Sequence, residues 1–231
     1  PHAPFIKTRE RSSMSITLYG ASLSPFVRKV RAVLAEKELQ YEQIHIDPFR
    51  LPEDYRELSP FGRIPALRDG DKVLVDSGVI CTYLEAQYPQ ISLNHSDPYL
   101  KARVQWFEKF GDYELAPIAT FGVFRNRVLM KLLRKPCDED HVTQCLEVKL
   151  PPLLDYLEAN APEQGFIVGD KLTVADIAIA THFVNFAHGG EQIDAQRWPK
   201  AAAYVQRILA RPSFASSIEQ EKAFLQKILS R

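Results

Sequence analysis

Three short motifs near the start of the chain hold the residues whose types and spacing could do chemistry. The first is Ser24-Pro25, which places a serine hydroxyl where a helix is predicted to begin. A hydroxyl there can donate a hydrogen bond to a sulfur anion, and the positive end of the helix dipole favours the same anion. The motif therefore predicts a site that raises the population of a thiolate near neutral pH.

The second motif is Ile64-Pro65, which lies within residues 59–67, SPFGRIPAL. A peptide bond that precedes proline adopts the cis form at modest cost. A cis bond here would leave the amide and the carbonyl of Ile64 free to pair with another backbone. A short peptide ligand could take that edge.

The third motif is Asp76-Ser77, which opens a further predicted helix. The free N–H groups at a helix N-terminus favour a carboxylate. Taken singly, Ile-Pro often just ends a strand and Asp-Ser is an ordinary helix cap. The order and separation of the three motifs are more specific. They resemble the glutathione pocket of the cytosolic glutathione transferase family, in its serine-type, bacterial-like branches.

The resemblance, which extends from residue 15 to about residue 220, implies a role for each motif residue. The active-site serine of those branches matches Ser24, whose hydroxyl would activate the glutathione thiol. The other implied contacts are main-chain hydrogen bonds from Ile64 to the cysteinyl unit, a cis peptide at Pro65, capture of the γ-glutamyl group by Asp76 and Ser77, and a basic residue, Arg63, near the glycyl carboxylate. A plain helix cap at Ser24 and a solvated loop charge at Arg63 are the alternatives.

Neighbouring residues add further interpretations. Ser22 is the rival donor to the thiol if the loop bends differently, whereas Tyr19 fits a strand side chain in the core. Ser59 stands where the family often has Asn. We expect that change to alter a local turn bond without removing a ligand contact.

Two related chemistries are disfavoured. Disulfide exchange requires an attacking sulfur, and the chain has Ser24 at the relevant position. The isomerase branch carries a Ser-Ser-Cys run followed by tryptophan and arginines, from which residues 23–26, LSPF, depart. The resemblance therefore implies conjugation of the glutathione thiolate to a small apolar electrophile, as in detoxification, or a related lyase or peroxidase reaction. A noncatalytic scaffold or regulatory protein of the same fold is the alternative.

Composition limits the partners. In 231 residues, 29 Lys and Arg balance 29 Asp and Glu, which gives no electrostatic reason to expect nucleic-acid or anionic-membrane binding. No apolar run approaches the roughly 20 residues that span a bilayer, and no secretory signal is visible, so we expect a soluble, cytoplasmic protein. Because Cys81, Cys137, Cys145 and the six histidines form no ligand spacing, we expect neither a disulfide framework nor a metal site.

The elements after Met14 alternate as strand, helix, strand, strand, strand, helix. The strands are expected at residues 15–19, 41–46, 66–68 and 72–75, and the helices at residues 25–37 and 77–88. Asp69-Gly70 predicts the hairpin between the last two strands. This order predicts an α/β thioredoxin-like N-terminal domain over residues 14–89, after a leader or tail at residues 1–13.

Residues 90–98 predict a linker, and residues 99–231 predict an all-α C-terminal helical domain. Segment 172–177, LTVADI, contains a capping box between Thr173 and Asp176 that predicts the start of a helix. The resemblance implies that this is the central helix of the second domain, which a similar capping box opens in the family. Two apolar stripes at helical spacing are expected to be buried: Trp106, Phe107, Phe110 and Tyr113, and Leu146, Leu150, Leu153, Leu154 and Leu157.

The helical domain should also wall the site for the electrophile. The candidates are Phe110, Tyr113, Phe121 and Phe124, with plain core packing as the alternative for each. The resemblance also implies a two-fold homodimer, in which the first domain of one subunit rests on the helical domain of the other. A surface cluster of Phe61, Tyr99 and Trp106 would support the dimer, whereas burial of all three within one subunit is the alternative.

Overall fold

The computed structural model describes residues 15–229, and the chain divides into two compact units, residues 1–92 and 93–231. The expected leader at residues 1–13 lies outside the described residues. The units are a small mixed sheet with helices and an all-helical unit, and the α/β thioredoxin-like plus all-α fold class is confirmed.

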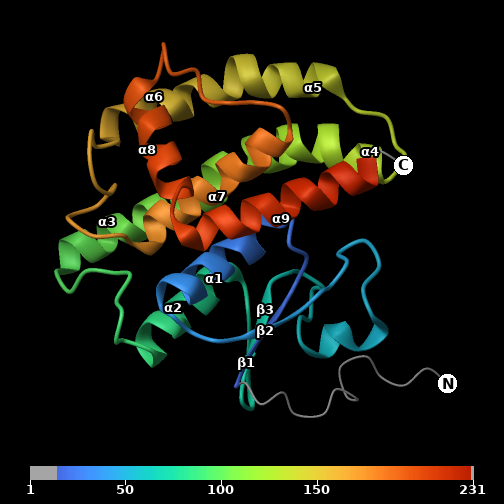
Figure 1. Ribbon diagram of the computed structural model, residues 1–231, viewed down its shortest axis with the longest axis vertical. Helices are drawn as coiled ribbons and strands as arrows, with labels where there is room; N and C mark the ends of the chain where they lie inside the picture. The colour runs from blue at the N-terminus through green and yellow to red at the C-terminus, as the bar shows by residue number, and fades with distance from the viewer. Residues whose placement is uncertain (1–14, 230–231) are drawn as a thin grey trace. The chain divides into compact units, whose positions relative to one another are not determined.

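The first unit is built on a four-stranded sheet with the strand order β2-β1-β3-β4. Strand β1 pairs in parallel with β2 and antiparallel with β3, which pairs antiparallel with β4. Helices α1 and α2 lie side by side, as Figure 1 shows. The element bounds are β1 Ile16–Tyr19, α1 Pro25–Glu36, β2 Glu42–Ile44, the short 3-10 helix η1 Glu53–Glu57, β3 Ala66–Asp69, β4 Lys72–Val75 and α2 Ser77–Gln87.

Hydrophobic burial explains most of these elements. All four residues of β1 are buried, as befits a strand with neighbours on both sides. Gly70 adopts a positive φ of 61° in the two-residue turn between Asp69 and Lys72. Strand β2 is shorter than the expected 41–46, because its partner β1 ends at Tyr19, which pairs with Ile44. Ile46 is still buried beyond the ladder.

The second unit is entirely helical over its described residues. Figure 1 shows α7 among the other helices of this unit, and it contacts α3, η2 and α8. The bounds are α3 Pro98–Lys109, the wider π-type segment η2 Phe110–Leu129, α4 Met130–Leu132, α5 Glu139–Gln144, the π-type turn η3 Cys145–Lys149, α6 Leu150–Asn160, α7 Val174–His188, α8 Pro199–Leu209 and α9 Pro212–Leu229.

The predicted capping box starts α7. Thr173 is its N-cap, and the Asp176 carboxylate accepts hydrogen bonds from the Thr173 amide at 2.9 Å and from its hydroxyl at 3.1 Å. Asp176 also accepts from the Ile167 amide and from the Tyr204 hydroxyl, each at 2.8 Å. Burial raises the pKa of Asp176, although these hydrogen bonds act in the opposite direction.

The first predicted apolar stripe is wrong at two positions. Phe107 and Phe110 are buried, but Trp106 and Tyr113 are 52% and 65% exposed. Spacing alone placed all four on one face, whereas only the inner pair packs against the unit's core. In the second stripe Leu150, Leu154 and Leu157 are buried, and Leu146 and Leu153 are half-buried.

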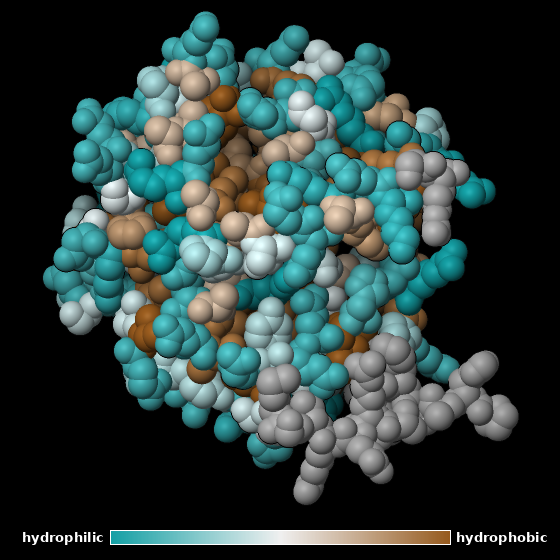
Figure 2. All heavy atoms as spheres, in the orientation of Figure 1, coloured by the Kyte–Doolittle hydropathy of each residue, from teal (hydrophilic) through white to brown (hydrophobic). Residues whose placement is uncertain are grey.

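Polar side chains dominate the face shown in Figure 2, with apolar side chains scattered among them. Within residues 15–229 no helix is both long and apolar enough to cross a membrane. No cluster of three or more His, Cys, Asp and Glu side chains in that range could hold a metal ion. Cys81 and Cys145 are buried, Cys137 is exposed, and none of the three forms a disulfide within the described residues.

Candidate functional site

The strand register brings the three sequence motifs to one end of the sheet. Tyr19 at the end of β1 pairs with Ala66 at the start of β3, and Ala66 pairs with Val75 at the end of β4. The loop to Ser24 follows Tyr19, Ile64-Pro65 immediately precedes Ala66, and Asp76-Ser77 immediately follows Val75. The register therefore gathers a hydroxyl, a backbone edge and a helix N-terminus from three separate stretches of sequence.

Ser24 is the N-cap of α1, and Pro25 takes the first helical position. The Ser24 Oγ accepts a hydrogen bond from the Val27 amide at 3.4 Å. A hydroxyl can accept one hydrogen bond while it donates another, so capping leaves the Ser24 hydrogen available to a ligand. The cap and the donor interpretations are therefore compatible with each other.

The loop that carries Ser24 is held at its first residue. Gly20 donates from its amide to the Ile44 carbonyl at 3.0 Å, and the Gln43 side-chain amide donates to the Gly20 carbonyl at 3.3 Å. A Cβ on Gly20 would collide with the Val27 side chain, so only glycine fits this approach of the loop to α1. Ser22 lies in the same loop and is half-buried.

The Ile64–Pro65 peptide bond is cis, as the resemblance implies. The amide and the carbonyl of Ile64 make no hydrogen bond to any residue within 15–229. The Ile64 side chain packs against a cluster that includes Tyr19 and Ala66. An extended peptide can pair with a backbone edge of this kind, which the packed side chain of Ile64 supports.

Two hydroxyl groups hold the segment that leads into this edge. Tyr55 Oη and Ser59 Oγ both donate to the Arg63 carbonyl, at 3.0 Å and 2.8 Å. The Ser59 bond is a local turn bond of the kind that the change from Asn was expected to alter, whereas the sequence motifs did not point to Tyr55. A signal was present, because Tyr55 is the only apolar residue in the charged stretch EDYRE, and a buried tyrosine usually finds a partner for its hydroxyl.

Asp76 caps α2 from an unusual backbone conformation. Its Oδ1 accepts from the amides of Gly78 at 2.9 Å and Val79 at 3.2 Å, and its φ is +76°. A positive φ outside glycine costs free energy and is concentrated at functional sites. The Ser77 hydroxyl bonds to no described residue, and Ser77 is buried at the first position of α2. The motif can therefore offer a carboxylate oxygen, a hydroxyl and a helix N-terminus together.

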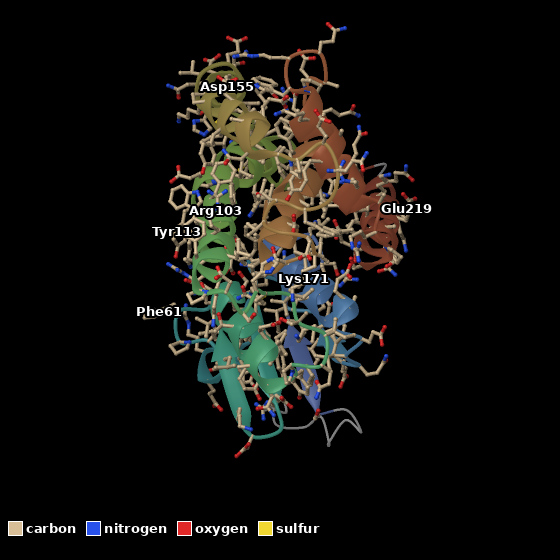
Figure 3. All side chains as sticks on the ribbon, turned by 90° about the vertical axis from the view of Figure 1, so that its left-hand side faces the viewer. Phe61, Arg103, Tyr113, Asp155, Lys171 and Glu219 are labelled. Carbon is tan, nitrogen blue, oxygen red and sulfur yellow. The ribbon has the colours of Figure 1, made fainter. Side chains whose placement is uncertain are left out.

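The remaining candidates divide between surface and core. The Arg63 side chain is exposed. Phe110 and Phe124 are buried, in line with the core alternative, whereas Tyr113 and Phe121 are 65% and 47% exposed. Figure 3 shows the Tyr113 side chain at the outer edge of its helix.

Comparison with known proteins agrees with this geometry. Residues 18–92 match a family model described as "Glutathione S-transferase, N-terminal domain", and residues 126–221 match "Glutathione S-transferase, C-terminal domain". Glutathione S-transferase 3 of Zea mays is 30% identical over 210 residues, which cover 88% of this chain and 93% of that protein. A maleylacetoacetate isomerase of Pseudomonas aeruginosa is 29% identical over 208 residues, which cover 87% of this chain and 93% of that protein.

A solved structure supports the same assignment. The crystal structure of a glutathione S-transferase from Rhodospirillum rubrum F11 is similar to this chain with a TM-score of 0.79 and 28% sequence identity. The similarity covers 86% of this chain and 90% of the other. It therefore spans most of both chains.

Proposed function

Because the chain belongs to the glutathione S-transferase family, we propose that it binds glutathione and activates its thiol for attack on a small apolar electrophile. Glutathione is the co-substrate of this family. The observation that carries the proposal is the strand register, which gathers Ser24, Ile64 and Asp76-Ser77 at one end of the sheet. A cytoplasmic location belongs to the same proposal.

Thiol activation falls to Ser24. Its hydroxyl donates to the glutathione sulfur, and the N-terminus of α1 adds a favourable potential. A free thiol has a pKa of about 8.5. Lowering that pKa by one unit stabilises the thiolate by about 1.4 kcal/mol. The serine does not have to act as a base, because hydrogen bonding to the anion suffices. Holding the thiolate against the electrophile contributes further.

Glutathione binding falls to the other two motifs. The Ile64 amide and carbonyl pair with the cysteinyl unit of glutathione, which is itself a short peptide. Ser77 and the start of α2 receive the γ-glutamyl carboxylate, and Asp76 faces the γ-glutamyl ammonium. The exposed Arg63 guanidinium serves the glycyl carboxylate.

The nature of the reaction rests on Ser24. Isomerisation is an alternative reaction, because one relative is a maleylacetoacetate isomerase. Residues 23–26 of this chain, however, lack the Ser-Ser-Cys run of that branch. Disulfide exchange is disfavoured because the chain has no cysteine at the Ser24 position. A noncatalytic scaffold has no need for an Ile64 backbone edge and a Ser77 hydroxyl that bond to no residue within 15–229 and lie at the same end of the sheet.

Retention on immobilised glutathione, followed by an assay with a small aromatic electrophile, tests this function. We expect retention, elution by free glutathione, and formation of the conjugate. Retention without conjugation to any of a panel of electrophiles would favour the scaffold. A protein that is not retained and shows no calorimetric heat with glutathione would contradict the proposal.

We predict that Ser77→Ala and Asp76→Ala weaken glutathione binding by about five- to fiftyfold, with a smaller effect on the rate at saturation. Ser77 loses a hydrogen bond to the ligand, and Asp76 loses an ion pair. Calorimetry on each variant measures the change. Asp76→Asn is the matched control, because it keeps an oxygen acceptor for the amides of Gly78 and Val79 but removes the charge. Wild-type affinity in both alanine variants would remove the motif from the site.

We predict a two-fold homodimer. Phe61, Tyr99 and Trp106 are 83%, 68% and 52% exposed, which excludes their burial within one chain, and Figure 3 shows Phe61 pointing away from its own loop. Large exposed aromatics favour a protein partner. Light scattering at micromolar concentration should give twice 26.3 kDa, and Phe61→Glu should shift the protein towards the monomer. The matched control is Phe49→Glu, at another exposed loop phenylalanine. A wild-type chain that remains monomeric at high concentration would contradict the dimer.

A further inference from the structure

We propose that Tyr55 and Ser59 are a pair of positioning residues that aim the Ile64 amide at glutathione, and that they set the affinity for glutathione without touching it. The inference rests on the proposed function and adds to it two residues outside the three motifs. It starts from one feature of the loop before Pro65. Both hydroxyl groups donate to a single backbone oxygen, the Arg63 carbonyl.

Both donors are buried, and their places are fixed. Tyr55 is 0% exposed and packs in a cluster with Tyr19, Ile44, Ile46, Leu58 and Ala66, beneath the same end of the sheet. Ser59 is 2% exposed, and its amide donates to the Tyr55 carbonyl at 3.0 Å. Burial raises the pKa of Tyr55 far above its ordinary value, so its hydroxyl keeps the proton that it donates.

The turn between the two donors and their acceptor is also fixed. Gly62 donates from its amide to the Ser59 carbonyl at 2.8 Å, which closes a turn over residues 59–62. Gly62 has a φ of +67°, and a Cβ there would lie 2.6 Å from Leu51 Cδ1. The turn bond therefore helps to present the Arg63 carbonyl to Tyr55 and Ser59, through a backbone conformation that favours glycine at position 62.

Peptide planarity transmits this restraint to Ile64. The Arg63 carbonyl and the Ile64 amide belong to the same peptide unit, which is trans, since the cis bond lies one residue later. In a planar trans peptide the C=O and N–H bonds point in opposite directions. Two hydroxyl groups that draw the carbonyl towards the buried cluster therefore turn the Ile64 N–H away from it. That N–H is the group left without a partner in the described range.

The arrangement also predicts how the two hydroxyl groups combine. A carbonyl oxygen accepts two hydrogen bonds, so loss of one donor leaves the peptide plane held by the other. Loss of both leaves the Arg63 carbonyl oxygen without either hydroxyl donor, at a part-buried position, and the peptide can then rotate to find water. The second deletion should therefore cost more affinity than the first.

Calorimetry with glutathione on wild type, Tyr55→Phe, Ser59→Ala and the double variant tests the proposal. We expect each single variant to bind about two- to fivefold more weakly, and the double variant at least about thirtyfold more weakly, beyond the product of the singles. The rate at saturating glutathione should stay within about twofold of wild type, because Ser24 is untouched. Ser59→Thr keeps a hydroxyl at this position, so it should bind glutathione more tightly than Ser59→Ala and recover most of the wild-type affinity.

The matched control is Tyr83→Phe. The Tyr83 hydroxyl donates a hydrogen bond to Asp69 Oδ2 at 2.9 Å, and Asp69 lies at the end of β3 that is far from Pro65. Burial is the main cause that raises the pKa of Tyr83 to about 12. This variant also deletes one tyrosine hydroxyl from the same unit. We expect it to bind glutathione as wild type does.

The outcomes separate this inference from the proposed function. No binding by the wild-type protein would overturn both. If the wild-type protein binds glutathione and the affinity of the double variant lies within threefold of wild type, the positioning role of Tyr55 and Ser59 is overturned and the proposed function stands. An equal loss in Tyr83→Phe would also overturn it, because the effect would then be general destabilisation. If Tyr55→Phe does not fold, Ser59→Ala and Ser59→Thr decide: the alanine variant should bind glutathione about two- to fivefold more weakly at an unchanged saturated rate, the threonine variant should bind close to wild type, and wild-type affinity in Ser59→Ala would refute the proposal.

Discussion

Replacing Ser24 by alanine is expected to lower the conjugation rate by roughly ten- to a thousandfold while glutathione binding is largely retained. The size follows from the loss of one hydrogen bond to a thiolate, which contributes a few kcal/mol at most. Steady-state kinetics at saturating glutathione measures the rate, and calorimetry measures the binding. The pKa of the bound thiol should rise in the variant, because the anion has lost its donor.

The same change also removes the cap of α1. Ser24 Oγ accepts from the Val27 amide at 3.4 Å, so some stability is lost with the hydroxyl. Ser24→Thr keeps a hydroxyl for both roles and should restore much of the activity. Ser22→Ala is the matched control, since it removes a hydroxyl from the same loop. An unchanged rate and an unchanged thiol pKa in Ser24→Ala would remove this residue from the mechanism and bring Ser22 forward.

Replacing Asp176 by alanine is expected to destabilise the helical unit by about 3–5 kcal/mol, a large part of the stability of an ordinary domain. The carboxylate is fully buried and accepts four hydrogen bonds, from the amides of Ile167 and Thr173 and from the hydroxyls of Thr173 and Tyr204. Alanine leaves these donors without an acceptor. Chemical denaturation, followed by a probe of helical content, measures the loss.

Two further variants separate the causes of this loss. Asp97→Ala removes the N-cap of α3, where an exposed carboxylate accepts, among residues 15–229, only from the Leu100 amide, so its effect should be much smaller. Asp176→Asn keeps one acceptor oxygen and should fall between the two. A stability of Asp176→Ala equal to that of Asp97→Ala would show that the buried network contributes little.

The first unit was largely predictable because its elements carry strong local signals. All four residues of β1 are buried, Asp69-Gly70 marks the hairpin, and Ser24 and Asp76 cap helices that begin where their motifs indicate. The three site motifs could be named as well, since each is a short run with its own backbone requirement. Their convergence depends on the pairing of Tyr19 with Ala66 and of Ala66 with Val75, which local patterns do not specify.

Long-range burial and side-chain contacts were less predictable. Helical spacing grouped Trp106 and Tyr113 with the buried Phe107, because periodicity reports a face and not what covers it. The contact of Tyr55 could not be predicted from local patterns, because its hydroxyl bonds to a carbonyl eight residues away. Asp176 was foreseen as a cap, but its bonds to Ile167 and Tyr204 needed the packed structure.

The most direct test of thiol activation is an ultraviolet titration of glutathione bound to the wild-type protein, which follows the thiolate absorbance as the pH is raised. Free thiols titrate near ~8.5, and the Ser24 hydroxyl at the N-terminus of α1 should lower the pKa of the bound thiol by about one unit or more. The same titration on Ser24→Ala should return the pKa towards that of the free thiol. A bound thiol that titrates as free glutathione does in the wild-type protein would contradict the account.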